Sequence, residues 1–229
     1  MKEWTGNLGA QEYIVRVLTM DQLENILRIQ DVVLDTIENK GFLSPVTREE
    51  FTHSIENRLM VGVFVEDELI AFRALAKPEI DEDHLGYDIG LSTEQLEKVV
   101  YQEITNVHPD YRGFGLQKKL GLIVMEMLDA SPYSHVCATV APFNIASLKD
   151  KISQGMVIGA LKNKYANMLR YVFYKKLHED RELGGEVIEV KMEDTEKQQQ
   201  LLAEGWIGTG MLQKDTVWYV SYEEKGTYL

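Results

Sequence analysis

The segment Val107–Gln117, which reads Val-His-Pro-Asp-Tyr-Arg-Gly-Phe-Gly-Leu-Gln, constrains the fold more than any other part of the chain. It follows an apolar stretch, Val99–Val107, and leads into an apolar helical period over Leu116–Leu128. This pattern predicts a strand, a turn with two glycines, and a helix. Glycines let a ligand approach the main chain closely, and the first N–H groups of a helix bind anions. We therefore expect this loop to hold a phosphate-bearing ligand, with Arg112 at its edge.

Two better-known phosphate loops do not fit this segment. The dinucleotide fingerprint needs a third glycine, but Gln117 and Lys118 follow Leu116. The nucleoside-triphosphate loop ends in Gly-Lys-Ser/Thr, which is also missing from the segment. The loop therefore belongs to another class of phosphate site.

Composition narrows the partners and the compartment. The net charge of −13 argues against a nucleic-acid partner. It favours cationic amine substrates, or it serves only solubility. The single cysteine, Cys137, cannot form an internal disulfide, which is typical of a reducing compartment. With no long apolar run and no signal-peptide pattern at the N-terminus, we expect a cytoplasmic protein that does not span a membrane.

Hydrophobic periodicity predicts a mixed α/β fold. The predicted strands are Tyr13–Leu18, Leu59–Val65, Leu69–Ala76, Val99–Val107, Ser134–Ala141, Met156–Lys162, Met168–Lys175, Val187–Met192, Trp206–Met211 and Thr216–Tyr222. The predicted helices cover Leu23–Ile37 after a capping box of Asp21 and Glu24, a short segment after Thr47 and Glu50, a turn after Ser92, the segment after the glycines, a segment that Asn144 or Ser147 caps and that ends at Gln154, and Thr195–Glu204. The segment Lys77–Gly90 is predicted as a loop, because it is rich in acids and turn residues.

Two motifs resemble those of one family, the GNAT superfamily of acetyl-CoA-dependent N-acetyltransferases. The acyl-CoA loop of this family has the pattern Arg/Gln-x-x-Gly-x-Gly/Ala. The three defined positions of this pattern are occupied here by Arg112, Gly115 and Gln117. Gln117 departs from the usual small residue. The second motif, Val140–Ser147, resembles the strand-to-helix junction in which the family's asparagine contacts CoA.

The resemblance implies a fold and a ligand. The fold is a mostly antiparallel sheet flanked by helices, with residues 1–184 as the acyl-CoA-binding domain and residues 185–229 as a C-terminal α+β extension packed on it. Acetyl-CoA is the implied co-substrate, its diphosphate held by backbone N–H groups and its arm paired with the strand before the loop. The residues implied to bind it are Val107, Arg112, Gly113, Phe114, Gly115, Leu116, Gln117, Asn144 and Ser147, with Lys118 and Lys119 offsetting charge.

Catalytic candidates follow from the chemistry of acetyl transfer to an amine, which requires the amine to be neutral. Glu103 is the best carboxylate base on the strand before the loop, unless it is a solvated edge residue; His108 lies in the adjacent turn and is a weaker candidate. The family's general-acid tyrosine is replaced by Lys151, so Lys151 itself, a water or a tyrosine must substitute. The tyrosines available are Tyr165, Tyr171 and Tyr174, of which we select Tyr171.

The remaining histidine and cysteine residues are weaker candidates for nucleophilic catalysis or metal binding. His135 and Cys137 share one face of a strand, where a nucleophile is conceivable but a buried thiol is far commoner. Histidine and cysteine show no metal-ligand spacing, so no metal is expected.

The sequence thus predicts direct transfer of an acetyl group from acetyl-CoA to the primary amine of a small molecule. The alternatives are a non-catalytic acyl-CoA-binding or regulatory module, and a protein N-acetyltransferase. The acceptor pocket is expected from three connections, Lys40–Val46, Lys77–Thr93 and Asn163–Asn167, because loops carry specificity. The sequence leaves a homodimer open.

Overall fold

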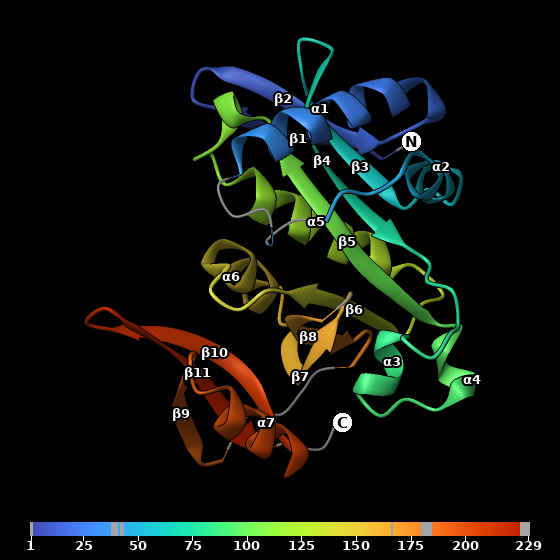
Figure 1. The fold of residues 1–229 in the computed structure, drawn as a ribbon. Helices are drawn as coiled ribbons and strands as arrows, with labels where there is room; N and C mark the ends of the chain where they lie inside the picture. Colours follow the sequence, from blue (N-terminus) through green and yellow to red (C-terminus); the bar gives the residue numbers. More distant parts are fainter. Residues whose placement is uncertain (1, 38–40, 42–43, 166, 180–184, 225–229) are drawn as a thin grey trace. The chain divides into compact units, whose positions relative to one another are not determined.

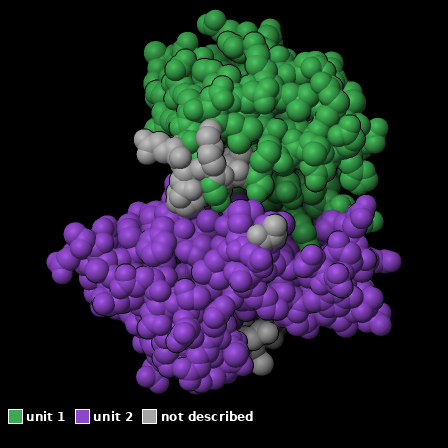
Figure 2. Space-filling model, viewed as in Figure 1, with its two compact units in different colours: residues 1–77, 101–127 green, residues 78–100, 128–229 purple. Residues whose placement is uncertain are grey.

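The structure is a computed structural model that describes residues 2–37, 41, 44–165, 167–179 and 185–224. It divides into two compact units, coloured separately in Figure 2. Unit 1 contains residues 1–77 and 101–127, and unit 2 contains residues 78–100 and 128–229. Within each unit, all strand pairs among the described residues are antiparallel.

Unit 1 is built on a sheet whose strands follow the order of the chain (Figure 1). The strands are β1 (Trp4–Leu8), β2 (Gln11–Val17), β3 (Met60–Val65), β4 (Glu68–Ala76) and, from residue 101 on, β5 (Val99–Val107). Its helices are η1 (Met20–Gln22), α1 (Leu23–Thr36), α2 (Arg48–Glu56), η3 (Pro109–Tyr111) and, up to residue 127, α5 (Leu116–Asp129). Strands that follow one another in the chain pair with one another, even where η1, α1 and α2 lie between β2 and β3.

The core of unit 1 lies between the sheet and α1 and α2. Apolar residues of α1, such as Ile26, pack with Phe51 of α2 and with Phe72 of β4. The rings of Phe51 and Phe72 meet edge to face with centroids 5.5 Å apart. In Figure 1 the helix α5 passes behind β5.

Of the capping boxes predicted at Thr47 and at Asp21, the structure confirms the first and contradicts the second. The capping box at Thr47 and Glu50 is confirmed, since each side chain accepts the other's backbone N–H. The capping box at Asp21 is wrong: residues 20–22 form η1, Gln22 precedes α1, and Asp21 accepts the hydroxyl of Thr19 instead.

Gln30 interrupts the apolar face of α1, and its side chain has a structural task. Its amide oxygen and nitrogen bond the backbone N–H and carbonyl of Val46, both at 2.9 Å. This pair satisfies a buried stretch of main chain, which explains why a glutamine lies in the core.

Strand β5 carries a bulge at Glu103. Ala74 pairs with Ile104, whereas the next residue, Leu75, pairs with Gln102, so Glu103 has no opposite residue on β4. A bulge redirects side chains and often lies next to active sites. The bulge therefore sets the orientation of the Glu103 side chain relative to its neighbours on β5.

The strands of unit 2 pair antiparallel in the order β6-β8-β7-β10-β11-β9. Its strands are β6 (His135–Val140), β7 (Val157–Lys164), β8 (Met168–Lys176), β9 (Val187–Lys191), β10 (Trp206–Lys214) and β11 (Val217–Glu224). Its helices are α3 (Leu85–Asp88), α4 (Thr93–Leu96), α6 (Ile145–Ser153) and α7 (Thr195–Ala203).

The C-terminal segment joins this sheet through β10, where Gly208 pairs with Ile158 of β7. Gln198 of α7 is fully buried and forms the centre of the attachment. Its oxygen accepts the hydroxyls of Tyr171 at 2.7 Å and Tyr222 at 2.9 Å, and its nitrogen donates to the carbonyl of Met192 at 2.9 Å. The predicted domain boundary at residues 184 and 185 adjoins residues 180–184, which lie outside the described part, and stays a prediction.

The mixed, mostly antiparallel α/β prediction is confirmed, with two local corrections. Strand β1 was not predicted, because Trp4–Leu8 contains a glycine and few apolar residues. The segment Lys77–Gly90 is not all loop, since it contains the helical turn α3. Among the described helices, none is long and apolar enough to cross a membrane.

Candidate functional site

The loop that we call the glycine loop, residues 112–117, connects η3 to α5. Gly113 and Gly115 have φ angles of +86° and +73°, a backbone conformation that residues other than glycine rarely adopt. A Cβ atom added to either glycine would meet nothing within 4 Å. The two glycines therefore leave open space directly in front of the main chain.

The backbone amides of this loop are available as donors. Arg112 N–H donates to Pro109 O at 3.2 Å, and Lys119 N–H donates to Gly115 O at 3.0 Å. The amides of residues 113–118, which lie between these two, have no acceptor within the described part of the chain. They lie just before and within the first turn of α5, a helix of 14 residues whose dipole adds positive potential at this end. This arrangement suits a multiply charged anion such as a diphosphate.

Cationic side chains surround the glycine loop. The exposed Arg112 donates from Nη2 to Thr36 Oγ1, at the end of α1, at 2.8 Å. This bond uses one of its five guanidinium donors, so others can reach a phosphate. Lys118 and Lys119 are exposed on the first turn of α5.

A second arginine, Arg73, lies behind the loop and was missed from the sequence. It is 1% exposed on β4, and its Nη1 donates to Gln117 O at 3.3 Å. An arginine within an apolar strand segment is the only sequence signal that could have identified it.

Glu103 lies at the bulge of β5, open to solvent. Even so, the protein atoms around its carboxyl group raise its pKa by desolvation, and the carboxylate of Glu50 on α2 raises it further. A carboxyl group with a raised pKa is a better proton acceptor near neutral pH than an ordinary glutamate.

Asn106, on the same strand, is 0% exposed, and neither its Oδ1 nor its Nδ2 has a hydrogen-bond partner among the described residues. Buried amides without partners are rare and costly, so such a group points to a missing water or ligand. The adjacent Val107 ends β5 and is half-buried. His108 is the N-cap of η3 and accepts the Asp110 N–H at 3.4 Å through Nδ1, which is a structural role.

The second motif belongs to unit 2. Of the two alternatives for capping α6, the structure has Asn144, whose Oδ1 accepts the Ser147 N–H at 3.3 Å. Phe143 before it has a φ of +65°, and its N–H contacts Met192 Sδ at 3.4 Å. The C-terminal segment thus supports the turn that presents Asn144.

The four candidates for the general acid differ in environment. Tyr171 is fully buried with its hydroxyl bonded to Gln198, and burial raises its pKa. Tyr174 is buried on β8, and Lys151 is buried beside Asp150 Oδ2 at 3.4 Å. Tyr165 is 52% exposed, with its hydroxyl 3.2 Å from Thr139 Oγ1. This geometry does not favour Tyr171, and Tyr165 is the solvent-accessible member of the four.

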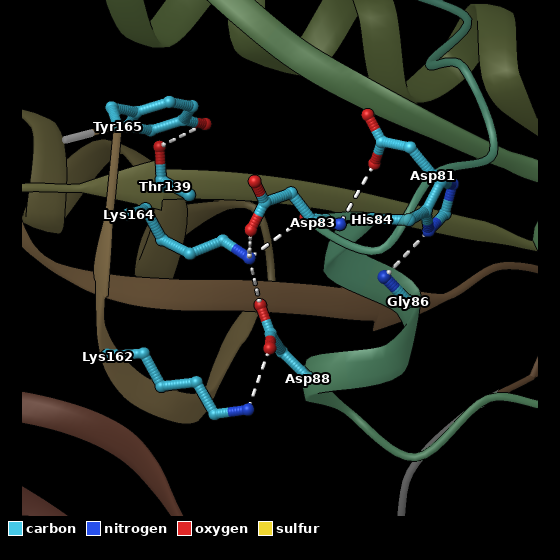
Figure 3. A network of polar contacts seen from close by, with 9 residues as sticks. All are labelled: Asp81, Asp83, His84, Gly86, Asp88, Thr139, Lys162, Lys164 and Tyr165. Atoms are coloured by element: carbon cyan, nitrogen blue, oxygen red, sulfur yellow. Dashed lines mark hydrogen bonds and ion pairs between the residues drawn. The ribbon is translucent and has the colours of Figure 1, made fainter.

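Two of the three predicted acceptor connections meet within unit 2 (Figure 3). Lys164, at the end of β7, contacts Asp88 Oδ2 at 2.8 Å and the carbonyl of Asp83 at 2.9 Å. Lys162 contacts Asp88 Oδ1 at 2.8 Å. These ion pairs hold the insertion Lys77–Thr93 against the turn Asn163–Asn167, of which residue 166 is outside the described part. The connection Lys40–Val46 is described only at residues 41 and 44–46.

The thiol of Cys137 lies in the core of unit 2. It is fully buried, and desolvation, followed by the charge of Asp88, raises its pKa. Nearby His135 is also buried, and desolvation lowers its pKa. Among the described residues, no group of histidine, cysteine and acidic side chains is arranged to hold a metal.

If the chain has the acetyl transfer that its sequence predicts, we expect Cys137→Ala to leave the rate unchanged, because a buried thiol with a raised pKa is a poor nucleophile. The measurement is the rate of CoA release, together with the reaction of native protein with a thiol reagent, which is expected only on unfolding. Loss of activity in a variant that keeps its melting temperature would support a covalent route through Cys137 instead.

Comparisons with known proteins identify the fold. No protein-family model matches the chain, and no curated protein matches it. Among solved structures, a GNAT-family acetyltransferase from Listeria monocytogenes is 14% identical with a TM-score of 0.56, covering 76% of this chain and 99% of its own. The YncA protein of Salmonella typhimurium, solved with its cofactor acetyl-CoA, is 17% identical with a TM-score of 0.53, covering 75% and 96%.

A ribosomal-protein-alanine N-acetyltransferase from Brucella melitensis is 21% identical with a TM-score of 0.53, covering 71% of this chain and 99% of its own. The three structures agree on the architecture. The chain therefore has the fold of the GNAT acetyltransferases, as its two motifs predict.

Proposed function

We propose that the protein is an N-acetyltransferase that moves an acetyl group from acetyl-CoA to a primary amine of a small molecule by direct transfer. The observation that carries this proposal is the run of open amides at residues 113–118 behind two glycines with positive φ. Fold alone does not define function. The chemistry of the loop supports a diphosphate-bearing co-substrate.

The glycine loop fits the diphosphate of CoA. Open amides donate to its oxygens, the space in front of Gly113 and Gly115 admits the ligand, and Arg112 offsets its charge. The backbone of Val107 and nearby residues of β5 would pair with the amides of the pantetheine arm. Asn144 and Ser147 are proposed as CoA contacts on the family resemblance alone.

Glu103 is proposed as the general base. It takes the proton from the acceptor's ammonium group, directly or through a water, and so frees the nitrogen lone pair. The nitrogen then bonds to the acetyl carbonyl carbon while the carbon–sulfur bond breaks, and the second nitrogen proton passes to a water. A water returns a proton to the departing sulfur, whose ordinary thiol pKa near 8.5 makes it a tolerable leaving group.

The test is release of free thiol from acetyl-CoA in the presence of a panel of amines. The panel combines small primary amines with peptides that have free N-termini, and mass spectrometry identifies the product that gains an acetyl group. Thiol release with a small amine is the expected result. Absence of CoA binding by calorimetry would overturn the proposal.

One observation favours the non-catalytic module as a second candidate. Lys151 replaces the family's tyrosine and is buried beside Asp150. Tight CoA binding without thiol release on any amine would support this module. Acetylation of peptide N-termini alone would support the protein N-acetyltransferase, the activity named for the Brucella melitensis structure.

Glu103→Gln is expected to lower kcat by on the order of 100-fold while the affinity for acetyl-CoA changes little. The base must be ionised, so the wild-type rate rises with pH through the raised pKa of Glu103 and the variant loses this limb. The measurement is kcat/KM against pH. Glu56→Gln, an exposed glutamate on α2, is the control.

The same substitution has a predicted effect on stability. The pKa of Glu103 is higher in the folded protein than in the unfolded chain. Its contribution to the free energy of unfolding is therefore fully present below the unfolded-state pKa and is lost as the pH rises through the folded-state pKa. Glu103→Gln therefore raises the melting temperature at neutral pH and leaves it unchanged near pH 3. A variant with normal rate and normal pH profile would remove Glu103 as the base.

A further inference from the structure

Arg73 is a buried cation that the proposed chemistry does not yet use. It lies on β4, between Val61 of β3 and Thr105 of β5, and it heads the fully buried side chains in volume. Placing a guanidinium in the interior costs free energy unless hydrogen bonds and a favourable potential compensate. Apolar residues would fill the same volume more cheaply, so its location calls for a function.

The contact of Arg73 joins the sheet to the glycine loop. Its Nη1 donates to Gln117 O, a carbonyl in the first turn of α5, at 3.3 Å. The loop itself has little packing, since Gly113 and Gly115 lack side chains and Phe114 is 54% exposed. Arg73 and the buried Leu116 therefore anchor the first turn of α5, and this turn aims the open amides.

The charge of Arg73 is unfavourable for the helix alone. The N-terminal end of a helix is positive, so a cation beneath it is repelled. An anion at the amides of residues 113–118 would reverse this balance, because the amides, the helix dipole and Arg73 would all attract it.

We infer that Arg73 is a positioning residue for the CoA diphosphate: it fixes the first turn of α5 and supplies a buried positive charge under the phosphate-binding amides. This inference rests on the proposed function, and it adds a residue of the sheet to the co-substrate site. The contact does not depend on the residue type at position 117, because it uses the backbone carbonyl of Gln117 and not its side chain.

The experiment compares two ligands by calorimetry: CoA, and pantetheine, which has the same arm without the phosphates. Arg73→Gln keeps a hydrogen-bond donor and removes the charge, whereas Arg73→Lys keeps the charge. We expect Arg73→Gln to weaken CoA binding at least tenfold, about 1.4 kcal/mol, with pantetheine affinity within twofold. Arg73→Lys is expected to retain CoA affinity within threefold.

Arg28→Gln, which removes an exposed positive charge from the same unit, is the matched control and is expected to leave both affinities unchanged. A purely structural Arg73 would weaken both ligands together, which would overturn the inference, as would unchanged CoA affinity in Arg73→Gln. If Arg73→Gln fails to fold, a tenfold loss of CoA affinity in a folded Arg73→Lys would also overturn it. Failure of the wild-type protein to bind CoA would refute the proposed function instead.

Discussion

Gly115→Asp is expected to abolish CoA binding, weakening it at least 100-fold, while the protein stays folded. The substitution puts a carboxylate into the open space in front of the amides of residues 113–118. This carboxylate repels the diphosphate and competes with it for the same donors. The left-handed conformation at φ +73° costs an aspartate about 1 kcal/mol, which a folded domain tolerates.

Calorimetric titration with CoA measures the effect, and thermal unfolding checks the fold. Gly9→Asp is the matched control, because Gly9 also has a positive φ of +62°, lies in unit 1, and has open space around its would-be Cβ atom. It changes charge and strain equally and is expected to leave CoA affinity unchanged. Wild-type affinity in Gly115→Asp would remove the glycine loop as the diphosphate site.

Gln198→Leu is expected to lower the free energy of unfolding by about 3–5 kcal/mol, the second large effect. The leucine would leave the hydroxyls of Tyr171 and Tyr222 buried without their acceptor and the carbonyl of Met192 without its donor. Each buried polar group that loses its partner costs about 1–3 kcal/mol. Urea denaturation measures the loss.

A neighbouring substitution and a rescue variant test the cause. Gln200→Leu changes an exposed glutamine on the same helix and is expected to alter stability by less than about 0.5 kcal/mol. Adding Tyr171→Phe and Tyr222→Phe to Gln198→Leu removes the two stranded hydroxyls and is expected to restore much of the stability. Equal stability of Gln198→Leu and wild type would show that these bonds are replaced by water.

Local signals predicted most of the fold because they depend on neighbours in the sequence. The hairpin β3–β4 and the helix α5 follow from the period of their apolar residues, and Thr47 with Glu50 defines a helix start. Strand β1 was not predicted, because it is an edge strand that contains a glycine and lacks a regular apolar pattern. At Asp21 the local pattern competes with a short 3-10 turn, which the sequence alone does not reveal.

The candidate site divides in the same way. The glycine loop could be predicted because its chemistry is contiguous, and Asn144 because a cap is local. The buried setting of Arg73 depends on strand order, and the direction of Glu103 depends on a one-residue bulge in the pairing of β4 with β5. The engagement of Tyr171 with Gln198 joins residues that are 27 positions apart and has no local sequence signal.

The ion pairs of Lys162 and Lys164 with Asp88 have a consequence for protein engineering (Figure 3). Because Lys164 and Asp88 are nearly buried, transplanting only one of the two connections into a chimaera would strand a charge in the interior. The insertion after β4 and the turn after β7 therefore form one exchangeable cassette. A graft of either connection therefore has to move both pieces together.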